Sequence, residues 1–207
     1  LDMFRRHIIQ LGTTGVFVIY DELEGKEAVT WSYLLHTVEL PMEIQELTDE
    51  VKVIGKNKAG GVSVAHLFSS AKTEQAMADT FFCAPTNWKN VTNAQGKALK
   101  YPNHWHFSST TVPCKTARFL TVMDTHGKNR PDMQVVRKGN TIQVGDWTIT
   151  CNLTEKGKAA IYVSNKTEKV SLNYDAGKKE GATIVTDQVK SKQVNKVLTD
   201  YLPDFEI

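Results

Sequence analysis

Short runs of β-branched and aromatic residues alternate with turn-forming residues along the first part of the chain. Residues 4–11 (FRRHIIQL) and 16–20 (VFVIY) are two such runs, and the loop GTTG joins them. A short, glycine-rich connection between two β-prone runs is typical of a β-hairpin. The pattern therefore predicts two antiparallel strands at the start of the chain.

A third run, residues 27–38 (EAVTWSYLLHTV), places apolar side chains at every second position and is followed by Pro41. This period predicts one half-buried strand. Asp21 and His36 then lie at the ends of neighbouring strands. We expect Asp21 to occupy a turn with Gly25 at the rim of the sheet and His36 to be partly buried. The alternative is a metal-binding carboxylate and imidazole pair.

Similar runs continue through most of the chain. Further strands are expected at residues 51–54, 61–69, 78–83, 104–112, 117–123, 133–138, 141–144, 147–153 and 159–164. Many short strands separated by turn signals favour an antiparallel sandwich over alternating strands and helices. We predict an all-β fold, an antiparallel β-sandwich of the two-layer or super-sandwich type, over residues 1–185.

One segment has the spacing of a helix. Its apolar positions are Val189, Val194, Val197, Leu198 and Tyr201, and Pro203 follows them. Residues 186–207 are therefore expected to form a short C-terminal helix, or a tail, packed on the sandwich.

Composition narrows the range of partners. The 207 residues include 25 basic and 23 acidic side chains, a net charge of +2, so no strong field is present to attract nucleic acid. An acidic polysaccharide needs only a few local Lys and Arg side chains and stays open as a partner. No apolar stretch reaches the roughly 18 to 20 residues of a membrane span.

The three cysteines, Cys83, Cys114 and Cys151, are an odd set without the C-x-x-C spacing of a metal site. Either all three are buried thiols, or two form a disulfide and one is free. We predict no metal site and no cofactor.

The most regular short pattern of possible ligands is His104-Trp105-His106. Residues two apart in a strand share a face, so both imidazoles can meet one ion or one sugar carboxylate. A metal site needs a third ligand, for which Asp124 and His126 are candidates. The other interpretation is an ordinary half-solvated sheet face.

The loop-like stretch 84–102 carries aromatic and basic residues. Exposed aromatic rings can stack on a sugar face while Lys89, Lys97 and Lys100 meet acidic groups. The predicted substrate-binding residues are Trp88, Tyr101, His104, Trp105 and His106. Alternatively, the loop folds back and Trp88 or Trp105 fills the end of the sandwich. No signature of a nucleophile or a phosphate loop occurs, so no catalytic residue is predicted.

Two passages resemble heparinase II/III-like polysaccharide lyases. In residues 5–37, Arg6 stands in an Arg-led strand, Asp21 ends the next strand, and Leu35-His36 ends the one after. Residues 104–128 are similar to the family's later strand pair, with the FLTVM strand beginning at Phe119.

The resemblance implies an N-terminal α-toroid followed by β-sandwich layers, and β-elimination of uronic-acid-containing glycans. That chemistry needs a base, a group that neutralises the carboxylate, and an acid for the leaving oxygen. The family's H-x-H-x-D metal pattern normally precedes the Arg-led strand and is not found before Arg5. We therefore expect a C-terminal β-sandwich support module, inactive by itself. Its partners are the missing N-terminal catalytic domain and an acidic polysaccharide, and its location is secreted or periplasmic. The alternatives are an independent carbohydrate-binding module that uses exposed aromatics and Lys, and a purely structural sandwich.

Overall fold

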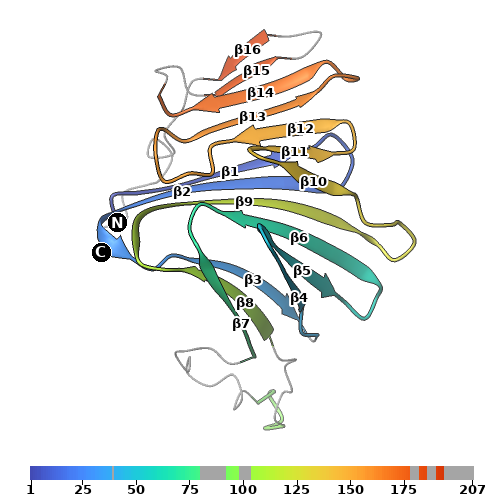
Figure 1. Cartoon of the computed structure of the whole chain (residues 1–207). Coiled ribbons are helices and arrows are strands. Elements are labelled where there is room, and N and C mark those ends of the chain that lie inside the picture. Colours follow the sequence, from blue (N-terminus) through green and yellow to red (C-terminus); the bar gives the residue numbers. More distant parts are fainter. Residues whose placement is uncertain (39, 80–91, 98–103, 178–181, 186–189, 194–207) are drawn as a thin grey trace. The chain divides into compact units, whose positions relative to one another are not determined.

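The computed structural model describes residues 1–38, 40–79, 92–97, 104–177, 182–185 and 190–193 (Figure 1). Its strands are β1 (Met3–Gln10), β2 (Val16–Val29), β3 (Ser32–Val38), β4 (Glu43–Leu47), β5 (Glu50–Lys56), β6 (Gly61–Ser69), β7 (Thr73–Ala78), β8 (His104–Thr111), β9 (Cys114–Gly127), β10 (Val135–Lys138), β11 (Thr141–Val144), β12 (Trp147–Cys151), β13 (Ala160–Asn165), β14 (Val170–Asp175), β15 (Ala182–Val185) and β16 (Lys190–Gln193). No helix occurs within these ranges, nor any segment that would cross a membrane as one. The predicted all-β class is confirmed.

The strands form three antiparallel sheets. One sheet has the order β1-β2-β9-β6-β5-β4, a second the order β3-β8-β7, and a third runs from β10 to β16 in chain order (Figure 1). The chain divides into two compact units, residues 1–132 and 133–207, and the first two sheets belong to the first unit. The expected domain boundary after residue 185 stays a prediction. Within the segment 186–207, expected to be a helix or a tail, residues 190–193 form the strand β16 and not a helix, and the apolar positions of the expected helix lie outside the described residues.

The first unit is a two-layer sandwich whose core lies between its six-stranded and three-stranded sheets. The buried cluster draws side chains from both sheets: Tyr33, Met42, Val53, Ala65, Leu67, Phe107, Cys114, Ala117 and Phe119. The rings of Tyr33 on β3 and Phe119 on β9 are 5.8 Å apart and tilted, a direct contact between the layers. Alternation along each strand thus sends every second side chain into this shared core.

The hairpin at the start of the chain is confirmed, because β1 pairs with β2 and Gln10 lies opposite Phe17. The second strand is longer than predicted, however, and runs through Asp21 and Glu22 to Val29. The expectation that Asp21 lies in a turn is therefore wrong. Charged residues are tolerated in this buried strand because β1 supplies arginine partners, as described below.

The expected strand 27–38 is divided at Trp31, which separates β2 from β3. The Trp31 backbone N–H donates to Thr111 Oγ1 at 3.0 Å, and its indole Nε1 donates to the Cys114 carbonyl at 3.1 Å. The ring also packs close to Gly25, where a Cβ would be only 3.3 Å from it. These contacts hold the corner at which the chain passes from one sheet to the other.

Several strands were missed because their sequences are polar. β4 (EIQEL) and β14 (VSLNYD) have little apolar alternation, and their sheet neighbours supply the pairing. β7 begins before the strand expected at 78–83, and most of that expected strand lies outside the described residues.

The seven-stranded sheet of the second unit has one apolar and one polar face. Ile142, Val144, Ile149, Ile161 and Val163 are buried on one face. Their strand neighbours on the other face are mainly hydroxyl and amide residues. Cys151 in this sheet and Cys114 in the first unit are buried free thiols, whereas Cys83 lies outside the described residues.

Candidate functional site

Two ion pairs join β1 to β2. Arg6 Nε and Nη2 donate to the two Asp21 carboxylate oxygens, each at 2.7 Å, and Arg5 Nη1 donates to Glu22 Oε1 at 2.9 Å. Both carboxylates are only 2% exposed. The hydrogen bonds that Arg6 donates to Asp21 raise the pKa of Arg6 above its usual range. Arg6 therefore binds both carboxylate oxygens of Asp21. His36 lies on β3 in the other sheet, so the structure does not bring Asp21 and His36 together as the metal-binding pair considered above.

A second polar network gathers at the end of β9. Asp124 is fully buried and accepts a hydrogen bond from Arg130 Nη2. His126 Nε2 lies 3.1 Å from Asp132 Oδ1 and 3.9 Å from Asp124 Oδ2. Lys52 Nζ lies 3.7 Å from Asp132 Oδ2. Asp124 and His126 thus lie together in the six-stranded sheet, whereas His104 and His106 lie on β8 in the other sheet.

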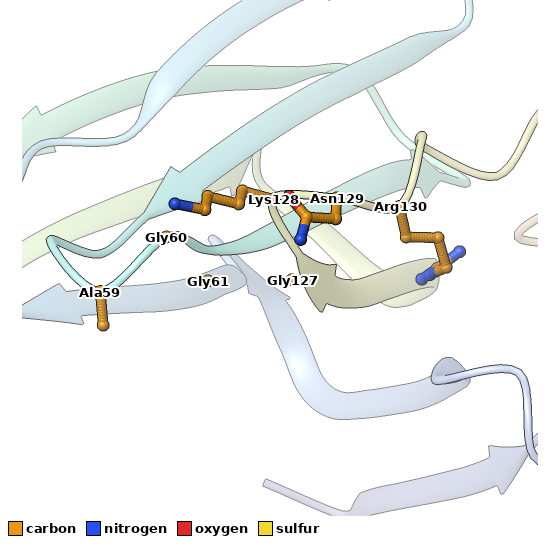
Figure 2. Close-up of a pocket in the computed structure, with 7 residues that line it drawn as sticks. All are labelled: Ala59, Gly60, Gly61, Gly127, Lys128, Asn129 and Arg130. Atoms are coloured by element: carbon orange, nitrogen blue, oxygen red, sulfur yellow. The ribbon is translucent and has the colours of Figure 1, made fainter.

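An open hollow of about 420 Å³ lies next to this network (Figure 2). Its lining comes from the β5–β6 turn and from the end of β9: Ala59, Gly60, Gly61, Gly127, Lys128, Asn129 and Arg130. In Figure 2 the Lys128 side chain extends over Gly60. Gly60 has a φ of +89°, and a Cβ there would be 3.0 Å from Lys128 Cδ. Glycine is needed at this turn both for its backbone conformation and for the room that it leaves to the lysine.

The hollow carries positive charge. Lys128 is exposed and forms no ion pair or hydrogen bond with another described residue. The charge of Arg130 is compensated by Asp124. Lys58 stands next to Ala59 in the same turn and adds a second cation nearby. A ligand that fits this lining is a carboxylate or sulfate group, which can meet an ammonium and the polar groups of a glycine-rich backbone.

The structure brings His104 and His106 to one face of β8, as the spacing predicted. Their face points away from the sandwich core, because Phe107, which follows His106 and projects to the opposite face of the strand, is fully buried. His36 lies directly opposite His106 and is exposed, which corrects the expectation of partial burial. Sequence reasoning did not group His36 with these two histidines, because only the β3–β8 register places it there.

Of the other predicted binding residues, the structure describes only Trp105. Trp105 lies on the face of β8 that carries Phe107 and is partly buried. Trp88 and Tyr101 lie outside the described residues, as do Lys89 and Lys100. Their roles in substrate binding stay predictions. Within the described ranges no group of three or more His, Cys, Asp or Glu is arranged to hold a metal ion.

Comparison with known proteins adds no family. No protein-family model matches the chain, and no curated protein matches it.

Proposed function

We propose that this chain is a non-catalytic β-sandwich module of a secreted or periplasmic heparinase II/III-like polysaccharide lyase. In this proposal the module contributes a binding contact for an acidic glycan, and other parts of the enzyme carry out the elimination. The observation that carries the proposal is the way in which the two resembling passages pair with each other.

The passages 5–37 and 104–128 are far apart in the sequence but supply neighbouring strands. β2 from the first pairs with β9 from the second, and β3 pairs with β8. They therefore contribute to both layers of one sandwich. If both passages resemble the family because they share its fold, they should form strands that pair with each other. The observed pairing supports treating the two passages as parts of one resemblance.

The chemistry of the hollow supports binding without cleavage. Elimination at a uronate needs a carboxylate-neutralising group, a base and an acid. Lys128 can supply the first of these. No imidazole, phenol or carboxylate belongs to the lining of this hollow. The nearby carboxylates Asp124 and Asp132 are engaged by Arg130, His126 and Lys52.

The first experiment tests the absence of catalysis. The folded chain is incubated with heparan sulfate, chondroitin sulfate and alginate, and the ultraviolet absorbance of the unsaturated uronate product is followed. A lyase of known activity serves as the positive control. We expect no rise in absorbance, and a rise that disappears when the chain is heat-denatured contradicts the non-catalytic assignment.

The second experiment tests the binding contact. We expect acidic oligosaccharides to bind more tightly than neutral dextran, with an affinity that falls as salt increases. Lys128→Gln is expected to weaken binding by about tenfold, since one charge-assisted hydrogen bond contributes about 1.5 kcal/mol. The matched control is Lys115→Gln, which removes the same charge from an exposed position at the other end of β9. Equal losses in the two variants, or no preference for acidic glycans, contradict the proposal.

A further inference from the structure

The three-stranded sheet presents an outward face on which histidines gather. Strand register assigns the outward positions to Ser32, Leu34, His36, Val38, Glu74, Ala76, Ala78, His104, His106, Ser108 and Thr110. Three of the six histidines of the chain are in this set, and no Lys or Arg is among these positions. His36 is exposed and His104 and His106 are half-buried, and the other described positions of this face carry apolar, hydroxyl-bearing or acidic side chains.

His36 and His106 form a cross-strand pair. They are directly opposite in the β3–β8 ladder, and their ring centroids are 5.9 Å apart at an interplanar angle of 45°. With metal–nitrogen distances of about 2.0–2.1 Å, two imidazoles on one ion have centroids roughly 4.5 to 6.4 Å apart, for ligand angles between about 90° and 180°. The observed separation lies within this interval, so the spacing of the two rings is compatible with binding one ion.

Burial of one ring nitrogen also restricts how the His106 ring can meet an ion. The Nδ1 atom of His106 is buried, which leaves Nε2 as the nitrogen that this ring can present. His104 lies two residues before His106 on the same face of β8, diagonal to His36. It is the nearest source of a further imidazole along the strand.

We propose that the His36–His106 pair is a binding site for one divalent transition-metal ion of the imidazole-preferring class, such as Ni²⁺, Cu²⁺ or Zn²⁺. The two imidazoles supply the protein ligands and water completes the coordination. With two protein ligands the site binds more weakly than a closed structural zinc site. A bound ion connects the edge strand β3 to the central strand β8 and so stabilises the sheet. This inference does not depend on the proposed function.

Ni²⁺ is the probe for the test, because it favours imidazole over the thiolates that attract Zn²⁺ and Cu(I). Calorimetric titration at neutral pH is expected to give one ion per chain, and binding is expected to weaken in acid because only neutral imidazole is a ligand. His36→Gln and His106→Gln are each expected to raise the dissociation constant by about tenfold or more. His7→Gln and Ser108→Ala serve as controls that keep the pair. The inference is overturned if either pair variant binds Ni²⁺ as tightly as the unaltered chain.

A second readout does not depend on variants that fold. Ni²⁺ is paramagnetic, so in the unaltered chain it is expected to broaden the nuclear magnetic resonances of the His36 and His106 rings first. Broadening that begins at His7, His66 or His126 places the ion elsewhere and refutes the site.

Discussion

Breaking the Arg6–Asp21 pair tests how the fold accommodates charge within a buried strand. Removing one partner of a buried ion pair costs about 3–5 kcal/mol, because the other charge is left uncompensated. Asp21 is 2% exposed, but the Arg6 side chain is 41% exposed, so water can replace part of the lost interaction. We therefore expect Arg6→Met to lower the free energy of unfolding by about 2 kcal/mol, or the Tm by roughly 4–8 °C for a chain of this size.

The assay is a double-mutant cycle measured by urea unfolding of Arg6→Met, Asp21→Leu and the double variant. Asp21→Leu leaves an arginine that water can reach, so its cost should be smaller than that of Arg6→Met. The double variant leaves no buried charge at this position and should recover part of the stability lost in Arg6→Met. Lys115→Met is the control for removing an exposed cation from the same sheet. The reasoning is refuted if Arg6→Met costs no more than Lys115→Met, or if the double variant is as unstable as the sum of the two singles.

Three further changes probe the core, the backbone and the pH dependence. Burial raises the pKa of the Tyr33 phenol above its usual value of about 10. The contribution of this pKa shift to stability is thus complete below about pH 10 and is lost as the pH rises from there through the raised folded pKa, so Tyr33→Phe should flatten the alkaline fall in unfolding free energy above about pH 10. Gly15→Ala should cost about 2 kcal/mol or more, because its φ is +79° and the new Cβ would be 2.6 Å from a β9 backbone oxygen. Gly139→Ala, with a φ of +59° and no atom within 4 Å, should cost about 1 kcal/mol in the same denaturation assay. Phe107→Ala, at a position with no exposure, should cost about 3–5 kcal/mol, whereas Leu34→Thr, 52% exposed on the same sheet, should change stability by less than about 0.5 kcal/mol.

Local patterning was sufficient to predict the fold class and many strands. β6 and β11 have the predicted bounds, because each is an apolar run between clear turn residues. Patterning failed for β4, whose polar sequence forms a strand only because β5 offers a partner. It also failed at Asp21, since a charged residue reads as a turn until its arginine partner on the adjacent strand is known.

The candidate sites, too, could be predicted from the sequence only in part. The spacing of His104 and His106 was enough to place both on one side of a strand, because side chains alternate with a period of two whatever the surroundings. That His36 lies opposite His106, and that Lys128 extends over Gly60, depends on register and turn geometry between segments far apart in the chain. Register is set when the inward side chains of both sheets pack into one core. This packing depends on many distant segments together, so no local stretch of sequence specifies it. The sequence by itself therefore determined many of the strands and the alternation of their side chains, and only the tertiary structure decided the polar strands and which side chains meet.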